Sequence, residues 1–364
     1  MPTRRSSAAT SATERGRPAP TRRFPAEWEP HAATWIAWPH HEPDWPGKLE
    51  AIPWVYAEIA RVLARHEPVE VLCHNEQVRD SARRCLSAHG VRANVRLHLV
   101  PTDRVWLRDS APTTVIRTDG NPELVNWRFN AWAKYDNYAR DEKVGAAVAK
   151  LCKLPRVEPL RPDCDERLVL EGGAIDTDGR RTLLVTEECL LSRVQARNPG
   201  LTRQGYERAF GEWLGIRRTI WLGQGCAGDD THGHVDDIAR FVAPEAIVLA
   251  YEEDPTDDNH RASKDNLRRL ELASGKAGDF TIVKLPYPRP VIMKGERLPA
   301  SYANFYVANG VVIVPTFNDP NDRVALNTLS AVFEGREVVG IHAVDLVWGL
   351  GTLHCLTQQQ TQGT

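Results

Sequence analysis

The stretch Gly349-Leu350-Gly351-Thr352-Leu353-His354-Cys355-Leu356-Thr357-Gln358-Gln359-Gln360 lies near the end of the 364-residue chain and decides how the fold closes. Its two glycines give the backbone the freedom that a tight turn or a close approach requires. The residues from Leu353 to Gln359 are predicted to form a strand. Cys355 lies where the turn meets this strand, so its thiol is a candidate nucleophile. A buried cysteine with only a structural role is the alternative.

Upstream of this stretch, one pattern of elements recurs four times. Hairpin turns are predicted at Asp119-Gly120, Asp178-Gly179, Pro244-Glu245 and Asn309-Gly310, and Asp-Gly and Asn-Gly are strong signals for a two-residue hairpin. Each hairpin is followed by a helical stretch, predicted over 141–150, 202–214, 263–273 and 322–333. Each helix is followed by an apolar strand, predicted over 157–160, 219–222, 281–285 and 338–341. The sequence therefore predicts a repeated strand–strand–helix–strand unit.

The two ends of the chain supply a fifth unit. A strand over 34–38, a helix over 52–64 and a strand over 69–73 lack one strand, which the C-terminal residues 353–359 provide. The predicted fold class is α/β, a five-bladed α/β propeller of pseudo-five-fold ββαβ repeats closed by the N- and C-terminal strands. Such closure removes exposed sheet edges. A helix over 77–88 and a strand over 95–100 are additional to this count.

The N-terminal residues differ in composition from the rest of the chain. Residues 1–23 are rich in Ser, Thr, Arg, Pro and Ala and hold almost no large apolar side chain, which predicts a disordered arm. No apolar stretch follows the early arginines, so a secretory signal peptide is rejected. Residues 24–364 are predicted to form a single catalytic domain.

The overall composition narrows the class of protein. Lys and Arg total 46 and Asp and Glu total 48, a net charge of −2, which gives no reason to expect nucleic acid or an acidic membrane surface as a partner. The chain has no apolar run long enough to span a bilayer. Its seven cysteines are scattered and contain no Cys-x-x-Cys pair. They are typical of reduced thiols, and the predicted location is cytoplasmic.

The repeat brings polar residues together that lie far apart in the sequence. The residues that precede the hairpins and the closing strand are Asp109, Glu171, His234, Asn304 and Cys355, and equivalent positions of a repeat are expected to meet at its axis. This set suits a reaction in which a thiolate attacks an electron-poor carbon, an imidazole moves protons and carboxylates hold a cation. Carboxylates alone oppose ionisation of a thiol, so the cluster indicates a cationic substrate.

Several motifs carry a resemblance to a known family. They are Trp106-Leu107-Arg108-Asp109-Ser110-Ala111-Pro112, Phe129-Asn130-Ala131-Trp132, Leu170-Glu171-Gly172-Gly173, Thr186-Glu187-Glu188-Cys189-Leu190-Leu191, Gly233-His234-Val235-Asp236, Asn318-Asp319-Pro320-Asn321-Asp322 and His354-Cys355-Leu356-Thr357-Gln358-Gln359. With these motifs the chain, from Glu27 to Gln360, resembles the agmatine deiminases and the bacterial peptidyl-arginine-deiminase-like proteins of the guanidino-modifying pentein superfamily. The fold of that family is the five-bladed α/β propeller.

The resemblance implies roles for individual residues. Cys355 is similar to the nucleophile that forms a covalent amidino-thioether, and His234 to the general acid and base. Asp109 and Asp236 are similar to the carboxylates that bind the guanidinium, and Glu171 to the partner that orients the histidine.

The resemblance also implies an activity. Agmatine and water are expected to give N-carbamoylputrescine and ammonia, with no metal and no organic cofactor. The expected partner is a small cationic guanidino substrate, and the chain is expected to form a homo-oligomer, often a dimer. Trp106 would offer a ring face to the cation, and Asn304 is a further candidate for substrate contact.

Departures from the family pattern lie where the tail of the substrate is expected. His232 stands where the family usually has an acidic or amide residue, Thr352 where it has Asn or Gly, and Ala133-Lys134 where it has Gly-Gly. Asp230 is a candidate partner for the far amine of agmatine.

Two further hypotheses remain beside agmatine. A peptidyl-arginine or free-arginine deiminase would need a cation to hold a carboxylate or peptide end, and Arg128 and Lys134 are the candidates. Thr231-His232-Gly233-His234-Val235-Asp236-Asp237 also resembles a metal-hydrolase signature, but it ends in Asp237 where that signature has histidine. A non-catalytic binding ring would not need Cys355 and His234 to meet.

Overall fold

The computed structural model describes residues 21–275 and 278–363, and strand–strand–helix–strand units dominate this part of the chain. In one unit, β11 (Ala239–Ala243) pairs antiparallel with β12 (Ala246–Tyr251), and helix α7 (Asn259–Ser274) leads to β13 (Thr281–Pro286), which is parallel to β12. The predicted order of elements is confirmed here, including the turn between the two antiparallel strands.

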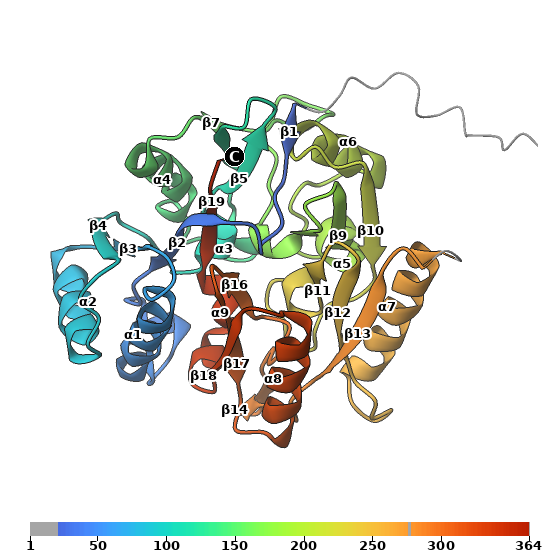
Figure 1. Cartoon of the computed structure of the whole chain (residues 1–364). Helices are drawn as coiled ribbons and strands as arrows, with labels where there is room; N and C mark the ends of the chain where they lie inside the picture. The colour runs from blue at the N-terminus through green and yellow to red at the C-terminus, as the bar shows by residue number, and fades with distance from the viewer. Residues whose placement is uncertain (1–20, 276–277, 364) are drawn as a thin grey trace, which may run out of the picture.

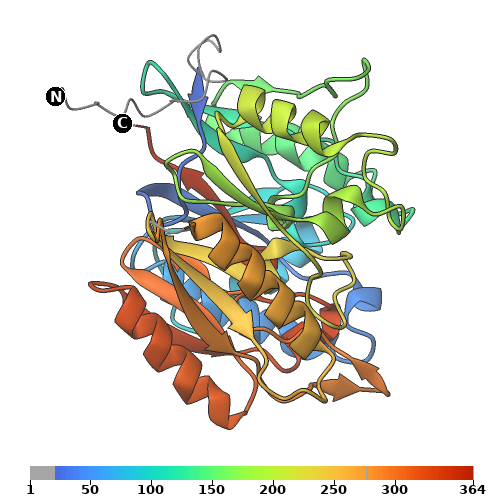
Figure 2. The same ribbon diagram turned by 90° about the vertical axis from the view of Figure 1, so that its right-hand side faces the viewer.

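Three other units have the same order and the same pairing. They are β5 (Thr113–Arg117), β6 (Pro122–Val125), α4 (Val144–Cys152) and β7 (Arg156–Val157); β8 (Asp176–Thr177), β9 (Thr182–Thr186), α6 (Arg203–Trp213) and β10 (Arg218–Leu222); and β16 (Tyr306–Ala308), β17 (Val311–Thr316), α8 (Pro320–Val332) and β18 (Glu337–His342). In Figure 1 the helices of these units lie on the outside of the molecule, and Figure 2 shows α7 and α8 covering the outer side of their sheets. The predicted α/β class is confirmed.

The two ends of the chain meet in one sheet, as predicted. Strand β19 (Gln358–Thr361) pairs antiparallel with β2 (His31–Ala37), and α1 (Ile52–Leu63) connects β2 to the parallel strand β3 (Val69–Cys73). Figure 1 shows β19 and β2 side by side in the middle of the molecule.

The elements that had no place in the repeat extend this sheet. Strand β4 (Val95–Leu99) pairs parallel with β3, and α2 (Glu76–Ala88) packs on α1 and on these strands. The strand order is therefore β19-β2-β3-β4.

The shorter elements complete the described part of the chain. They are the helices α3 (Leu107–Ser110), α5 (Glu187–Leu191) and α9 (Leu353–Leu356), the strands β1 (Arg22–Arg23), β14 (Ile292–Met293) and β15 (Glu296–Arg297), and single 3-10 turns that include η3 (Ala131–Ala133), η5 (Gly172–Ala174) and η6 (Val235–Asp237).

The prediction of a strand from Leu353 to Gln359 was wrong in its first half. The chain forms the helical turn α9 before β19 begins at Gln358. The Leu356 amide donates to the Thr352 carbonyl at 3.3 Å, and the Thr357 hydroxyl donates to the Leu353 carbonyl at 2.8 Å. These local bonds use groups that a strand would have offered to a neighbour. Cys355 therefore lies on a buried helical turn.

The predicted disordered arm over 1–23 does not extend to its last residues. Residues 1–20 lie outside the described residues, whereas Arg22 and Arg23 form β1, which pairs antiparallel with β5. The Arg22 guanidinium donates to Glu123 at 2.6 Å, and Arg23 pairs with Glu29. These ion pairs hold a polar segment that has no apolar side chain of its own.

Amphipathic helices and capping residues explain the local structure. Helix α1 buries Ile52, Tyr56, Ile59 and Leu63, at the spacing of one helical face. Asn75 caps α2, and Asp319 with Asp322 forms a capping box at the start of α8. Each large apolar side chain so buried contributes about 1.5–3 kcal/mol.

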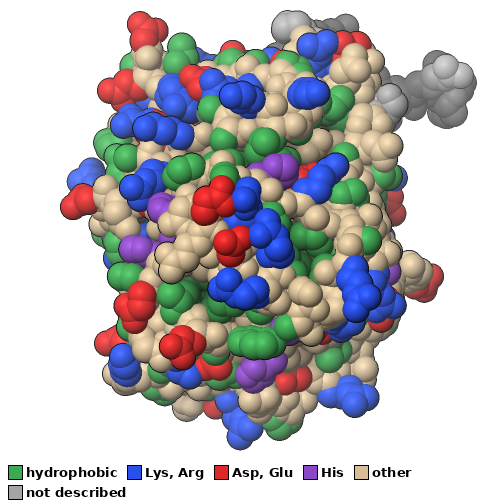
Figure 3. Space-filling view, turned by 90° about the vertical axis from the view of Figure 1, so that its left-hand side faces the viewer, with side chains coloured by type: hydrophobic (Ala, Val, Ile, Leu, Met, Phe, Trp, Pro, Cys, Tyr) green, Lys and Arg blue, Asp and Glu red, His purple; other side chains and the backbone are tan. Residues whose placement is uncertain are grey.

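The surface charge and the state of the cysteines are those expected from the composition. Basic and acidic side chains are intermixed on the face shown in Figure 3. All seven cysteines are free thiols. Among the described residues, no helix combines the length and the apolar character needed to cross a membrane.

Candidate active site

A cavity of about 500 Å³ lies beside the helical turn α9, and Cys355 is one of its lining residues. Asp109 on α3 lines the same cavity. The remaining wall consists of aromatic rings and charged side chains, among them Trp106, Trp132, Tyr135, Asp44, Arg104 and Asp230. This arrangement places one thiol and one carboxylate in a chamber that an organic cation can enter.

Cys355 is positioned by a fixed amide. Asn304 Nδ2 lies 3.1 Å from Cys355 Sγ and donates to Asp237 Oδ1 at 2.9 Å. Asn304 Oδ1 accepts from the Thr352 hydroxyl at 2.7 Å and from the His354 amide at 3.0 Å. These partners define which end of the amide faces the sulfur. Burial raises the pKa of the Cys355 thiol well above its ordinary value, and the charges of Asp236, Asp237 and Asp109 add to this effect.

Asp109 is aimed by two donors. The indole Nε1 of Trp132 donates to Oδ2 at 3.0 Å, and the Gly173 amide donates to Oδ1 at 3.0 Å. Burial raises the pKa of Asp109 to about 6, the nearby carboxylates of Asp236 and Glu171 add to the increase, and His234 opposes it. Asp109 is therefore an anion at neutral pH that protonates in mild acid.

Trp132 reaches Asp109 from a strained turn. Ala131, Trp132 and Ala133 all have left-handed φ values, of 49°, 59° and 53°. Residues with a Cβ rarely adopt this conformation, and each such residue costs of order 1–3 kcal/mol. The Asn130 side chain accepts from the Ala133 amide at 3.0 Å and closes the turn.

His234 is buried among carboxylates and has no hydrogen-bond partner among the described residues for either ring nitrogen. Its Nδ1 lies 3.9 Å from Asp109 Oδ1 and 4.0 Å from Asp236 Oδ1, and its Nε2 lies 3.9 Å from Glu171 Oε2. Burial opposes the charged ring, but Asp109, then Cys189 and Glu171, raise the pKa of His234 well above its ordinary value.

Glycine is required where these groups approach each other. A Cβ on Gly173 would lie 2.5 Å from His234 Nδ1 and 3.0 Å from Asp109 Oδ1. A Cβ on Gly351 would lie 2.8 Å from the Trp106 ring and 3.1 Å from Cys355 Cβ. Any side chain at either position would displace a group of the candidate site.

Glu171 is held by a buried arginine. Arg197 Nε donates to Glu171 Oε1 at 3.0 Å, and the other nitrogens of Arg197 donate to the carbonyls of Gln195 and Thr231. Burial alone would favour the neutral acid, but the Arg197 guanidinium and His234 lower the pKa of Glu171 to about 2. Its second oxygen, Oε2, faces His234 and has no hydrogen-bond partner among the described residues.

Asp236 lies between two histidines. Its Oδ2 contacts His354 Nδ1 at 2.6 Å, whereas its Oδ1 faces His234 and has no hydrogen-bond partner among the described residues. Burial would raise the pKa of Asp236, but the hydrogen bond and charge of His354 outweigh burial and lower it. Asp236 is therefore a second anion beside the thiol, since Cys355 Sγ lies 4.0 Å from Oδ2.

The mouth of the cavity holds paired charges. Asp230 accepts from the Lys134 ammonium and from the Tyr135 hydroxyl, the latter at 2.8 Å. Asp44 pairs with Arg104, whose guanidinium lies 4.1 Å from the centre of the Tyr135 ring. Burial raises the pKa of Asp44 to about 7, and Arg104 opposes the increase.

The structure brings most of the predicted site residues to one place. Asp109, Glu171, His234, Asp236 and Cys355 form a contiguous cluster. The remaining predicted residues occupy different places: Trp106 and Asp230 line the cavity, Asn304 lies behind the thiol, and Lys134 pairs with Asp230. Arg128 lies apart from them, because it lines a neighbouring cavity of about 380 Å³.

Several residues of the site were not predicted. Trp132 and Arg197 hold Asp109 and Glu171, and Glu27 and Arg108 contact His354. Trp132, Arg108, Glu27 and His354 all lie inside or beside motifs that the sequence presents, but no spacing rule pairs them. Proximity to a motif is the only sequence signal for their role.

The potential metal-ligand atoms of the stretch from Thr231 to Asp237 do not meet at one point. His232 Nε2 lies 3.0 Å from the Ser192 hydroxyl. Within the described residues, the groups whose potential ligand atoms lie within 4.8 Å of one another are Glu171 with Cys189 and His234, and Asp236 with Asp237 and Cys355. His232 belongs to neither group, so the His-x-His-x-Asp spacing is not a single ligand set here.

The cluster therefore offers a thiol, an imidazole and ionised carboxylates around a common space. Carboxylate oxygens accept from the N–H groups of a planar guanidinium, and a thiolate beside them can attack its central carbon. An imidazole within 4.0 Å of the same carboxylates can move protons.

Comparison with known proteins gives the same chemistry. Residues 23–361 match the Porphyromonas-type peptidyl-arginine deiminase family. The agmatine deiminase of Pseudomonas syringae pv. syringae is 37% identical over 93% of this chain and 95% of its own, and that of Pseudomonas aeruginosa is 36% identical over the same shares.

Solved structures agree with these matches. The agmatine deiminase of Enterococcus faecalis has a TM-score of 0.85 and 29% identity over 94% of this chain and 96% of its own. That of C. jejuni has a TM-score of 0.81 and 26% identity over 94% and 97%. Both the predicted resemblance and the class of enzyme, a hydrolase of carbon–nitrogen bonds in linear amidines, are confirmed. The chain belongs to the Porphyromonas-type peptidyl-arginine deiminase family.

Proposed function

We propose that this enzyme hydrolyses agmatine to N-carbamoylputrescine and ammonia through a covalent intermediate on Cys355. One observation carries the proposal. Both ring nitrogens of His234, Asp236 Oδ1 and Glu171 Oε2 are buried without hydrogen-bond partners among the described residues, and Asp236 links them to the thiol, because its Oδ2 lies 4.0 Å from Cys355 Sγ. Leaving a buried polar group unpaired costs about 1–3 kcal/mol. A guanidinium has five N–H donors in one plane and can satisfy the carboxylates.

The first half of the reaction forms the intermediate. The Cys355 thiolate attacks the guanidinium carbon, and a carbon–sulfur bond forms. Protonated His234 gives its proton to the departing amino group, the carbon–nitrogen bond breaks, and ammonia leaves. Asp109 and Asp236 hold the remaining amidine.

The second half releases the product. Neutral His234 takes a proton from water, whose oxygen attacks the same carbon. The carbon–sulfur bond then breaks, which returns the thiolate, and the proton of the added hydroxyl passes to solvent, which leaves the neutral urea group of N-carbamoylputrescine. Atoms and charge balance because one water enters and one ammonia leaves together with the proton that the guanidinium cation carried.

The protonation states support a cationic substrate. In the free enzyme, burial and three carboxylates raise the pKa of Cys355, so the thiol form dominates. A guanidinium between Asp109 and Asp236 would offset that negative charge and favour the thiolate. The reactive thiolate therefore forms mainly when the cationic substrate is bound, which limits reaction of Cys355 with other molecules.

The rim of the cavity supports an amine tail over a carboxylate tail. Asp44 and Asp230 both line the cavity, and either carboxylate can accept from the ammonium of agmatine. An arginine substrate would need a free cation, but Lys134 is already paired with Asp230 and Arg128 lines the neighbouring cavity. The relatives from Pseudomonas and Enterococcus are named for the agmatine reaction.

We also propose the finer features that the resemblance implies. The repeated units, with β19 and β2 joining the ends, support a five-bladed propeller. A homodimer is expected, and sizing by light scattering tests it. A cytoplasmic location is supported by seven free cysteines and remains to be tested by fractionation. We expect a single catalytic domain over 24–364, with neither a metal nor an organic cofactor.

Ammonia release tests the proposed function. Purified, EDTA-treated protein is assayed against agmatine, arginine and a peptide with C-terminal arginine, beside the Cys355→Ala variant. Agmatine turnover that survives EDTA and is abolished in the variant supports the proposal. Turnover of arginine or of the peptide instead would contradict the choice of substrate, and full activity of Cys355→Ala would contradict the mechanism.

A further inference from the structure

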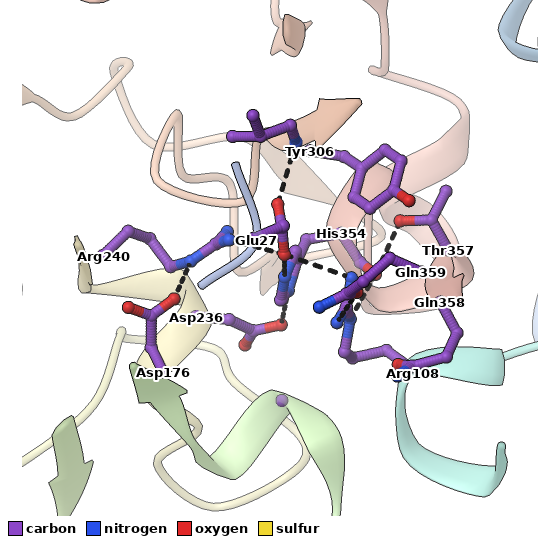
Figure 4. Close-up of polar contacts among 12 residues, drawn as sticks. Glu27, Arg108, Asp176, Asp236, Arg240, Tyr306, His354, Thr357, Gln358 and Gln359 are labelled. Carbon is purple, nitrogen blue, oxygen red and sulfur yellow. Dashed lines mark hydrogen bonds and ion pairs between the residues drawn. The ribbon is translucent and has the colours of Figure 1, made fainter. Parts of the chain in front are cut away.

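A buried network of charged side chains lies directly beneath the candidate active site. His354 Nδ1 contacts Asp236 Oδ2 at 2.6 Å, and His354 Nε2 contacts Glu27 Oε2 at 2.7 Å. Glu27 also pairs with Arg240 at 2.9 Å and with Arg108 at 3.4 Å. Figure 4 shows these side chains converging on Glu27 from separate segments of the chain.

Both ring nitrogens of His354 face a carboxylate oxygen. Ionised carboxylates only accept hydrogen bonds, so each nitrogen must carry a proton to pair with its partner. The ring is then an imidazolium. Glu27 is essential to this state, because without it one nitrogen would face no anion.

The charges of the network cancel. Glu27, Asp236 and Asp176 supply three negative charges, and His354, Arg108 and Arg240 supply three positive charges; Arg240 donates to Asp176 at 2.7 Å. The pKa of Glu27 is well below its ordinary value because Arg240 and His354 outweigh the effect of its burial. Loss of one charge would leave the others unbalanced in a buried region.

The network ends at the substrate side of the cluster. Asp236 uses Oδ2 for His354, while Oδ1 faces His234. The rotation of the carboxylate is thus set by His354. Glu27 itself is held by the Val307 amide at 2.8 Å, and Arg108 donates to Gln359 at 2.7 Å, so the N-terminal segment and β19 support one catalytic carboxylate.

We propose that His354, clamped between Glu27 and Asp236, is a positioning residue that keeps Asp236 ionised and turns its free oxygen toward the substrate's guanidinium. The inference deepens the proposed deiminase function and rests on it. Glu27 acts one step further away, through His354. Neither side chain needs to touch the substrate.

Other ionisable groups also face this pair from every side. Asp109, His234, Asp237 and Cys355 lie on the substrate side, and Arg108, Arg240 and the Tyr306 ring lie on the other. Among the described residues, only Glu27 and Asp236 have carboxylate oxygens within 4.0 Å of the His354 ring nitrogens. A substitution of Glu27 is therefore expected to alter the ionisation and orientation of Asp236 mainly through His354.

The kinetic test uses Glu27→Gln and His354→Gln. Each change replaces a charged side chain with the neutral amide of glutamine, which is of similar size. We expect the KM for agmatine to rise about 10- to 100-fold in each variant, with kcat falling much less, because a guanidinium carboxylate is lost or misdirected. The KM should also begin to rise at a higher pH in the variants than in the wild type as the pH is lowered, because Asp236 protonates more easily without the imidazolium.

Glu67→Gln is the matched control. Glu67 is an equally buried carboxylate that contacts His31 at 3.2 Å and accepts from the Asn309 amide at 2.7 Å, away from the cavity. This variant should lose thermal stability and keep the KM of the wild type. An unchanged KM and pH dependence in folded Glu27→Gln and His354→Gln would overturn the proposal, as would a loss confined to kcat.

A second measurement does not depend on turnover. Nitrogen-15 NMR of the imidazoles, with the His354 signal identified by its absence in His354→Gln, should show a doubly protonated ring at pH 7.5 in the wild type. A neutral ring there would overturn the proposal even if Glu27→Gln fails to fold. If the wild type does not turn over agmatine, the proposed function fails, and the imidazole signal still decides the state of His354.

Discussion

Two buried histidines lie on opposite sides of Asp236, and their surroundings differ. His354 has both ring nitrogens within 2.7 Å of carboxylate oxygens, whereas His234 has its nearest carboxylates at 3.9–4.0 Å and no hydrogen-bond partner among the described residues. One carboxylate thus has a satisfied side and an open side. The satisfied side supports the fold and the geometry, and the open side is where a substrate can gain hydrogen bonds.

The difference has an energetic meaning. A buried polar group without a partner costs about 1–3 kcal/mol, and the cluster holds four such atoms, on Glu171, Asp236 and both nitrogens of His234. Such a cost persists when the open groups have a function in binding or catalysis. The comparison therefore predicts that changes on the open side reduce activity more than stability.

The largest effect is expected on the open side, at His234. In His234→Gln the proton donor is lost, and kcat should fall by about 10²- to 10⁴-fold. The melting temperature should fall less than in a variant that breaks a direct ion pair, because the carboxylates around His234 lie 3.9–4.0 Å from its ring and no hydrogen bond among the described residues would be broken. Steady-state ammonia release and differential scanning calorimetry measure the two quantities.

A matched change at a fully paired carboxylate away from the cavity sharpens this test. Glu67→Gln interrupts a fully paired carboxylate and should lower the melting temperature while kcat stays near the wild-type value. A stability loss in His234→Gln as large as that of Glu67→Gln would contradict the division between open and satisfied groups.

Substrate binding is the next largest effect, at Asp109. Asp109→Asn should raise the KM for agmatine by about 30-fold or more, because one buried charge partner of the guanidinium is removed. The wild-type enzyme should show a related pH dependence. The pKa of Asp109 is raised to about 6, so its charge is present above pH 6 and KM should increase as the pH falls through that value.

The variant itself controls the pH experiment. An asparagine cannot titrate, so the increase in KM near pH 6 should be much weaker in Asp109→Asn, measured from pH 5 to 8. The same increase in both proteins would show that another group titrates there.

The smallest effect is expected at the rim, where the ion pair between Lys134 and Asp230 is partly exposed. Lys134 competes with an incoming ammonium for Asp230. Lys134→Ala should lower the KM for agmatine by no more than about fivefold, because exposed ion pairs contribute about 0.2–1 kcal/mol. Asp230→Asn should change KM in the opposite direction. A higher KM in Lys134→Ala would mean that the lysine assists binding.

The repeated units could be predicted because their signals are local. Asp119-Gly120, Asp178-Gly179 and Asn309-Gly310 identify hairpins from two residues each, and helical spacing identifies the segment between the hairpin and the third strand. The helical turn at Cys355 was mistaken for a strand, because four residues are too few to show a period and the deciding bonds run to Thr352 and Thr357.

The sequence alone determined the α/β class, the pairing of the two chain ends, and the identity of Asp109, Glu171, His234, Asn304 and Cys355 as one cluster, because equivalent positions in a repeat must occupy equivalent places. The role of Asp236 came from the resemblance to a known family. Only the tertiary structure decided which buried groups are paired. Glu27 and His354 are 327 positions apart, and their contact depends on the packing of the N-terminal segment against α9. Side-chain hydrogen bonds require separations of about 3 Å, and no local pattern in the sequence specifies distances at that scale between remote residues.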